Sequence, residues 1–124
     1  MTAQLLFETT NTILYCKQWQ TTVAFYRQLF GLPETFVGDW FVEFALSATA
    51  RLSIADERRA TVKSSGGQGI TLTFQVAELA QVRQTLLTRG ASPGAIRQHQ
   101  WGAQVFYLFA PEGHRLEFWS TKAA

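Results

Sequence analysis

The most informative segment of this 124-residue chain covers positions 110–119 and reads Ala110-Pro111-Glu112-Gly113-His114-Arg115-Leu116-Glu117-Phe118-Trp119. Proline presets one backbone dihedral and glycine tolerates a positive φ, so Pro-Glu-Gly is typical of a tight turn. The residues after the turn alternate in character, which is the pattern of a strand with one face in a core. Leu116 and Phe118 fall on the core face, with His114 as a polar exception at the start of the strand. Arg115, Glu117 and Trp119 fall on the other face, where we take Glu117 as the floor of a cleft.

Composition narrows the class of protein. The chain is 47% hydrophobic and 16% charged, which is typical of a globular fold. A formal net charge of +2 without a stripe of Lys and Arg argues against nucleic-acid binding. No apolar run approaches the roughly 18 residues of a membrane span, and the first residues lack the basic start of a secretion signal. The single cysteine fits a reducing compartment. We therefore expect one cytoplasmic domain over residues 1–124. We expect neither a nucleic-acid nor a membrane partner.

The expected elements occur in the same order twice. The first half predicts strand, helix, strand, strand and strand at 11–17, 20–30, 35–37, 40–44 and 50–55. The second half repeats this order at 70–76, 78–89, 95–97, 103–109 and 114–119. Thr21 is the expected N-cap of the first helix. Gly31 and Gly90 end the two helices and lie about 60 positions apart, a spacing typical of a duplicated unit.

We therefore predict an α+β fold with a first module at about 11–56, a Gly/Ser-rich linker at about 57–69 and a second module at about 70–120. Three segments within it resemble the vicinal oxygen chelate superfamily, which includes glyoxalase I, extradiol dioxygenases and bleomycin resistance proteins. They are TVAFYRQLFGL at 22–32, FQVAEL at 74–79 and FYLFAPEGHRLE at 106–117. The resemblance implies that two tandem βαβββ modules form a curled mixed sheet around a cleft, with the helices on the outside.

The resemblance also implies where a metal ion would be held. Metal-dependent members place one ligand on the first strand and one on the last strand of each module. These places correspond to Asn11, Ser53, Thr71 and Glu117. Of these, Glu117 alone is a strong ligand, because zinc-like ions want three or four donors from His, carboxylate or thiolate. We therefore expect no metal site and no cofactor. If the protein is an enzyme, Glu117 is its catalytic candidate.

Side chains of matching parity on the first and last strands of each module are expected to line the cleft. Trp40 and Trp101 follow the two equivalent hairpin turns, where flat indoles could stack on a planar ligand; the alternative is that they pack in the core or at a dimer interface. For Glu117, the alternative is an ordinary solvated pair with Arg115. The predicted ligand-binding residues are Asn11, Tyr15, Trp40, Ser53, Thr71, Thr73, Trp101, Arg115, Glu117 and Trp119.

The histidines and the cysteine do not form a recognisable catalytic constellation in the sequence. His114 is expected to be an exposed turn residue. His99 is expected to be a loop residue without a role, and the alternative is a place near the rim of the cleft with Trp101. Cys16 has the opposite parity to Asn11 and Tyr15, so it is expected to face the helices as a buried small hydrophobe rather than act as a nucleophile.

These observations favour a metal-independent small-molecule binding protein, similar to the bleomycin resistance proteins, that sequesters an aromatic drug or metabolite. Two alternatives stay open. One is a metal-dependent lyase or dioxygenase of the glyoxalase type with an atypical site, and the other is an interaction module without a ligand. The resemblance further implies a homodimer, and the apolar segment Leu5-Leu6-Phe7 is a candidate for its contact.

Overall fold

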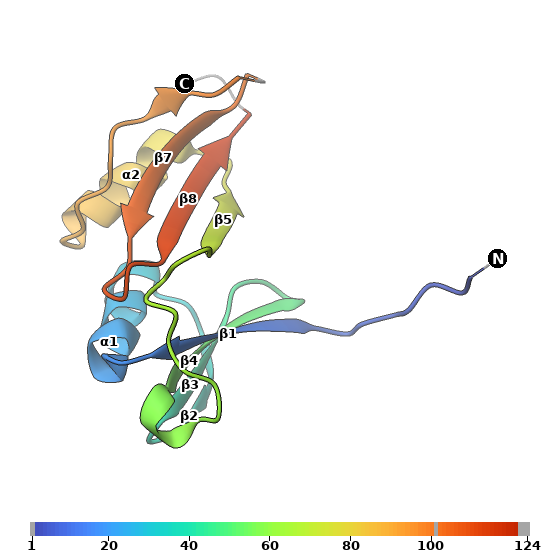
Figure 1. The fold of residues 1–124 in the computed structure, drawn as a ribbon. Helices are drawn as coiled ribbons and strands as arrows, with labels where there is room; N and C mark the ends of the chain where they lie inside the picture. Colours follow the sequence, from blue (N-terminus) through green and yellow to red (C-terminus); the bar gives the residue numbers. More distant parts are fainter. Residues whose placement is uncertain (1, 101, 122–124) are drawn as a thin grey trace.

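The computed structural model describes residues 2–100 and 102–121 (Figure 1). The first module contains β1 (Thr10–Cys16), α1 (Trp19–Phe30), β2 (Glu34–Val37), β3 (Phe41–Ala45) and β4 (Ala50–Asp56). The second module contains β5 (Thr71–Gln75), α2 (Leu79–Thr88), β6 (Arg97–Gln98), β7 (Gln104–Phe109) and β8 (Arg115–Ser120). A short 3₁₀ turn, η1 (Glu57–Arg59), begins the segment between them. The predicted βαβββ order is therefore confirmed in both halves of the chain.

The strands form two four-stranded mixed sheets rather than one continuous sheet. The first sheet has the order β1-β4-β3-β2 and the second has the order β5-β8-β7-β6. In each module the helix provides the long crossover that a parallel pair needs, so the first strand runs parallel to the last. This arrangement leaves β1 and β5 as edge strands. Figure 1 shows the two sheets at opposite ends of the molecule.

Helix α1 follows from its apolar spacing and its terminal glycine. Val23, Tyr26 and Leu29 are buried at helical spacing, and the helix packs on β1 and β4. Gly31 ends it with a φ of 61°, a left-handed conformation that glycine adopts without strain. The predicted C-terminal end of this helix is therefore confirmed.

The predicted N-cap of α1, Thr21, is wrong. The helix starts at Trp19, and Gln18 occupies the N-cap position without making a capping hydrogen bond from its side chain. The acceptor comes from the second module instead. The carboxylate of Glu112 accepts hydrogen bonds from the backbone N–H groups of Lys17 and Gln18 at 3.0 and 2.7 Å. A local pattern could not reveal this cap because its donors and its acceptor are far apart in sequence.

Aromatic rings connect the two modules. Phe30, at the end of α1, lies edge-on to Phe74 and Phe118 of the second sheet, with ring centroids 5.7 and 6.0 Å apart. Phe118 also stacks on Phe106 at 4.9 Å. Such ring pairs add to the burial of large apolar areas, and these residues belong to one hydrophobic cluster. The two modules therefore share a core.

The segment at 57–69, predicted as a linker, lies against the turn at 111–113. The hydroxyl of Ser64 donates to Oε1 of Glu112 at 3.1 Å, and Gly67 is buried where it meets the backbone of Gly113. The small residues of this segment therefore allow its backbone to approach the turn at 111–113 closely.

His114 is buried, and the prediction that it is an exposed turn residue is wrong. Its side chain is 2% exposed, because the segment at 57–69 covers the start of β8. His114 lines a small hollow there together with Lys63 and Tyr15. Among the described residues, Nδ1 of His114 has no hydrogen-bond partner. Burial lowers the pKa of His114, and the nearby negative charge of Glu112 opposes this shift.

The buried imidazole predicts a loss of stability in mild acid. The unfolded chain binds a proton at the ordinary pKa of about 6.5, whereas the folded chain binds it at a lower pH. The contribution of this group to stability is therefore fully present above pH 6.5 and is lost as the pH falls below it towards the folded pKa. Urea unfolding at pH 7.5 and pH 5.5 measures this loss. In His114→Gln the difference between the two pH values should shrink, and an equal loss in both proteins would contradict this origin.

Candidate functional site

A hollow opens on the outer face of the second sheet. Strand β8 buries Leu116 and Phe118, whereas Arg115, Glu117 and Trp119 lie on the opposite face, as their alternation predicted. The hollow has a volume of about 290 Å³. It is lined by Thr73, His99, Ala103, Val105, Glu117 and Trp119. We call it the Glu117 hollow.

Glu117 is held in place by a neighbour on β5. The parallel register places Thr73 beside Glu117, and Thr73 Oγ1 donates to Glu117 Oε1 at 2.7 Å. Among the described residues, no hydrogen bond to Glu117 Oε2 is formed. A half-buried carboxylate with one oxygen oriented in this way can accept a hydrogen bond from a bound molecule.

Arg115 has partners other than Glu117. Its Nε donates to Thr71 Oγ1 at 3.1 Å, and its guanidinium carbon lies 4.7 Å from the centre of the Tyr107 ring. This is cation–π geometry. The ion pairs found in the described part of the chain do not include Arg115 with Glu117. The structure therefore does not show Arg115 and Glu117 as an ion pair.

A second polar cluster lies on the first sheet. Ser53 Oγ donates to Asn11 Oδ1 at 2.8 Å, and Asn11 Nδ2 donates to Glu43 Oε1 at 3.3 Å. Thr35 Oγ1 donates to Glu43 Oε2 at 2.6 Å, and Arg51 Nε lies 3.9 Å from the same oxygen. The cluster is internally hydrogen-bonded around Glu43, the carboxylate at its centre.

The remaining predicted residues lie elsewhere. Tyr15 is half-buried beside the segment at 57–69. Trp40 lies at the turn between β2 and β3, where its ring is 5.7 Å from that of Phe41. The prediction for Trp101 lies outside the described residues. In the described parts, 2–100 and 102–121, no hydrogen bond connects Asn11 or Ser53 with the residues that line the Glu117 hollow.

The four positions implied for a metal ion do not fit one within a single chain. Asn11 and Ser53 bond to each other on the first sheet, and Thr71 accepts from Arg115 on the second. Glu117 is the one carboxylate of the set. Within residues 2–100 and 102–121, no three His, Cys, Asp or Glu side chains lie together in a group that could hold a metal ion.

Glu43 and Tyr107 were not among the predicted site residues. Glu43 faces Ser53 across the first sheet, and Tyr107 faces Glu117 across the second. A signal for both was present, because each is a polar group within an otherwise apolar alternating strand. His99 lines the Glu117 hollow, which agrees with the alternative place near the cleft rim and not with a loop residue far from the site.

Cys16 is fully buried, as predicted. Burial raises the pKa of its thiol to about 12, a shift that the nearby carboxylate of Glu112 reinforces. Its Sγ donates weakly to the carbonyl oxygen of Leu14 at 3.7 Å. A thiol that stays protonated at neutral pH has the chemistry of a small hydrophobe, not of a nucleophile.

The chain resembles several solved structures. One is a glyoxalase/bleomycin resistance protein/dioxygenase from Nocardioides, with a TM-score of 0.76 and 17% identity over 96% of this chain and 85% of that one. Another is a lactoylglutathione lyase from Agrobacterium tumefaciens, with a TM-score of 0.74 and 16% identity over 97% and 96% of the two chains. A third is a bleomycin resistance determinant encoded on the transposon Tn5, with a TM-score of 0.71 and 16% identity over 98% and 100%. At these identities the likeness shows the fold.

Sequence comparison identifies the family. No curated protein matches the sequence significantly. Among the described residues, no helix has both the length and the apolar character needed to cross a membrane. Residues 8–118, however, match the model of the Glyoxalase/Bleomycin resistance protein/Dioxygenase superfamily. Because this match covers most of the chain and the two βαβββ modules agree with it, the chain belongs to the Glyoxalase/Bleomycin resistance protein/Dioxygenase superfamily.

Proposed function

We propose that the protein binds a small planar molecule without a metal ion and that the Glu117 hollow holds this ligand. The observation that carries the proposal is the combination of apolar walls, an indole and a carboxylate in one hollow of about 290 Å³. Ligand sites are typically concave and mostly apolar, with a few polar groups that set the orientation of the ligand.

The chemistry of the lining indicates the class of ligand. Ala103 and Val105 are buried and apolar, and the indole of Trp119 offers a flat surface for an aromatic ring. Glu117 supplies a negative charge that accepts an N–H group most strongly when the donor is itself positively charged. A flat aromatic amine satisfies all of these groups at once. The proposed role is to sequester an aromatic drug or metabolite of this kind.

The proposal predicts that Glu117→Gln weakens the binding of a flat aromatic cation. Proflavine, added to the wild-type protein, should quench its tryptophan fluorescence, since Trp119 lines the hollow. Replacing the carboxylate with an amide removes the charge but keeps the shape of the side chain. The dissociation constant for proflavine should therefore rise about tenfold.

The matched control is Glu43→Gln, which makes the same change of charge in the cluster on the first sheet. It should leave the affinity for proflavine within about twofold of the wild-type value, because Glu43 does not line the hollow. A flat anion such as 9-anthracenecarboxylate should bind the wild-type protein more weakly than proflavine. Equal effects of the two variants would show a general effect of net charge and would contradict the proposal.

Elemental metal analysis of the untagged protein tests the absence of a metal ion. Near-stoichiometric nickel, zinc, manganese or iron that is lost in Glu117→Ala would contradict a metal-independent site and favour the lyase or dioxygenase alternative. The expected result is a substoichiometric content that does not differ between the wild-type protein and Glu117→Ala.

We also propose that the protein is a homodimer in the cytoplasm. A single buried thiol that needs no disulfide partner supports a reducing compartment. The apolar residues that project at the start of the chain support self-association.

A further inference from the structure

His114 is a buried polar residue with an unusual environment. Its side chain is 2% exposed, and its Nδ1 forms no hydrogen bond with any of the described residues. Buried polar groups are nearly always hydrogen-bonded, so an exception needs a physical explanation. His114 does not line the Glu117 hollow, and the proposed function therefore gives its imidazole no partner either.

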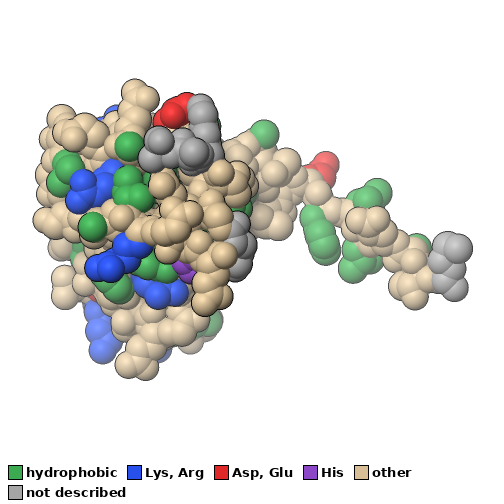
Figure 2. Space-filling model, turned by 90° about the horizontal axis from the view of Figure 1, so that it is seen from above, with side chains coloured by type: hydrophobic (Ala, Val, Ile, Leu, Met, Phe, Trp, Pro, Cys, Tyr) green, Lys and Arg blue, Asp and Glu red, His purple; other side chains and the backbone are tan. Residues whose placement is uncertain are grey.

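The imidazole of His114 lines a separate hollow of about 180 Å³. Strand β1 of the first module forms one wall and the segment at 57–69 forms another, with contributions from the residues just before β5 and β8. Residues 2–9 run away from the body of the molecule (Figures 1 and 2) and do not line the hollow. The lining residues are Ile13, Leu14, Tyr15, Val62, Lys63, Ser65, Ile70 and His114.

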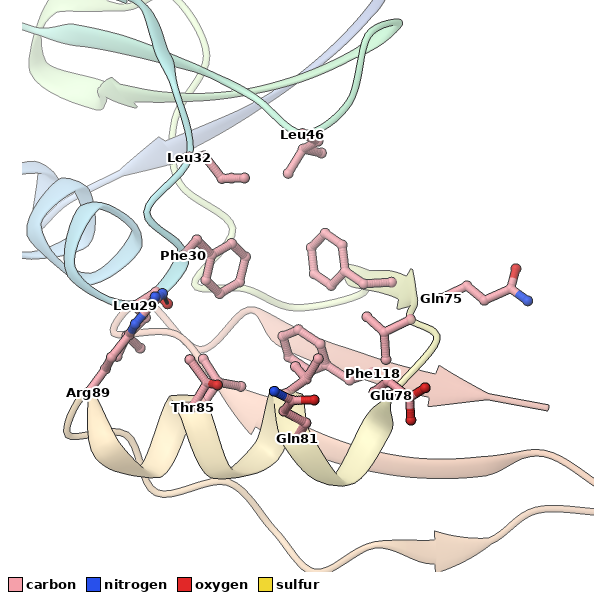
Figure 3. A pocket seen from close by; sticks show the side chains of 14 residues that line it. Leu29, Phe30, Leu32, Leu46, Gln75, Glu78, Gln81, Thr85, Arg89 and Phe118 are labelled. Carbon is pink, nitrogen blue, oxygen red and sulfur yellow. Dashed lines mark hydrogen bonds between the residues drawn. The ribbon is translucent and has the colours of Figure 1, made fainter. Parts of the chain in front are cut away.

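The larger groove between α2 and β5 differs from this hollow. It has a volume of about 420 Å³ and an apolar floor that includes Phe74, Leu86 and Phe118. Among its polar lining residues, Gln75 points away from the cavity (Figure 3). None of the described residues that line this groove has a buried polar side-chain atom without a partner. The hollow at His114 therefore has a requirement for a polar ligand that the larger groove lacks.

Lys63 gives the hollow at His114 an oriented positive charge. Its Nζ donates to the carbonyl oxygens of Glu57 and Ala60 at 2.7 and 3.0 Å. An ammonium group has three N–H donors, so a third remains for a ligand. Lys63 takes part in none of the ion pairs found in the described part of the chain. Its charge is therefore held by neutral groups and is not neutralised by a carboxylate.

The carboxylate closest in effect to His114 already has its own partners. The negative charge of Glu112 acts on His114, but its oxygens accept from the backbone N–H groups of Lys17 and Gln18 and from the hydroxyl of Ser64. Among the described residues that line the hollow there is no Asp or Glu. An anion in the hollow would therefore meet an ammonium group and an imidazole without facing a carboxylate in the lining.

We propose that this hollow binds a short aliphatic monocarboxylate. The carboxylate accepts hydrogen bonds from the third N–H of Lys63 and from the imidazole of His114. The aliphatic chain of the ligand lies against Ile13, Val62 and Ile70. At about 30 Å³ for each water-sized group, a hollow of about 180 Å³ has room for about six non-hydrogen atoms, which is the size of butyrate. The inference goes beyond the proposed function and does not rest on it.

The first test uses the two histidines as separate reporters. His99 and His114 are the only histidines of the chain, so a comparison with His99→Gln assigns their ring C–H signals in the NMR spectrum. Sodium butyrate, at an ionic strength matched with sodium chloride, should shift the His114 signals with half-saturation at about 10 mM or below. The His99 signals should stay in place. No saturable shift of the His114 signals up to about 100 mM butyrate would overturn the proposal.

The second test removes the charge of Lys63. Lys63→Met keeps a long unbranched side chain, and the dissociation constant for butyrate should rise at least about tenfold. The matched control is Lys17→Met, since Lys17 is exposed and does not line the hollow. This variant should stay within about twofold of the wild-type value, because solvent and salt screen a distant exposed charge. Circular dichroism checks the fold of both variants, and equal losses of affinity would contradict the proposed contact.

Two further ions test the chemistry of the ligand. Butylammonium has the same aliphatic chain with a positive charge, and it should leave the His114 signals in place. Inorganic phosphate should bind more weakly than butyrate because it makes no apolar contact. Equal shifts by butylammonium, or equal or tighter binding of phosphate, would overturn the assignment to an aliphatic carboxylate. Butyrate should not change the affinity for proflavine, so this inference and the proposed function can fail independently.

Discussion

Replacing Gly67 with alanine should lower the free energy of unfolding by about 3 kcal/mol or more. Gly67 has a φ of +79°, a left-handed conformation that is strained for alanine. A Cβ atom at this position would also overlap the carbonyl carbon of Gly113 and the backbone nitrogen of His114, and it would lie 2.7 Å from the carbonyl oxygen of Gly113. Because these atoms belong to the backbone, the clash cannot be relieved by rotating a side chain.

Gly69→Ala is the matched control for this prediction. Gly69 has nearly the same φ, +75°, but a Cβ atom there would meet nothing within 4 Å. Its replacement should therefore cost about 1–2 kcal/mol, the cost of the left-handed backbone alone. Urea unfolding of the two variants and the wild-type protein measures both losses. If the two glycines cost the same, the contact between the segment at 57–69 and the turn at 111–113 does not hold the structure together.

Replacing Glu112 with alanine should lower the free energy of unfolding by about 2–3 kcal/mol. The carboxylate accepts from the backbone N–H groups of Lys17 and Gln18 and from the hydroxyl of Ser64. Hydrogen bonds to a charged acceptor are among the stronger ones. These bonds connect the turn before β8 to the start of α1 and to the segment at 57–69, so one side chain ties three parts of the chain together.

Two smaller substitutions separate the contributions of the individual hydrogen bonds to this loss of stability. Ser64→Ala removes one donor and leaves both backbone bonds, so it should cost about 1 kcal/mol. Glu112→Gln keeps one acceptor oxygen without the charge and should fall between Ser64→Ala and Glu112→Ala. Hydrogen exchange provides the specific readout, because the amide protons of Lys17 and Gln18 should exchange faster in Glu112→Ala. Unchanged exchange at these amides would refute the role of Glu112 as a cap.

Local sequence patterns were sufficient to locate most of the elements. The apolar spacing of α1 and the glycine after it placed the end of the helix, because both signals act within one or two turns. Alternation along β8 correctly separated Leu116 and Phe118 from Glu117 and Trp119, and parity along β1 correctly placed Cys16 in the core. The weak strand expected at 95–97 forms at Arg97–Gln98 instead, where it pairs with β7.

The contacts between polar side chains on the sheet faces could be predicted only in part. Thr73 and Glu117 do meet, because they face each other in the register of two paired strands. Asn11 and Ser53 also meet, but on the other sheet and around Glu43, which the sequence analysis did not single out. Parity tells which face of a strand a side chain takes, and it does not tell how far apart two faces lie.

The burial of His114, the capping of α1 by Glu112 and the approach of Gly67 to Gly113 were decided by tertiary structure. Each brings together segments that are about 45 or more positions apart. Secondary-structure propensity and hydrophobic periodicity depend on residues that are close together in the sequence. They therefore cannot predict a contact between distant segments. The repeated order of elements, the alternation along strands and the helix ends could be predicted from the amino-acid sequence, because each depends on short stretches of chain. The packing of one turn on a distant segment forms only when the two modules share a core, so the tertiary structure decides it.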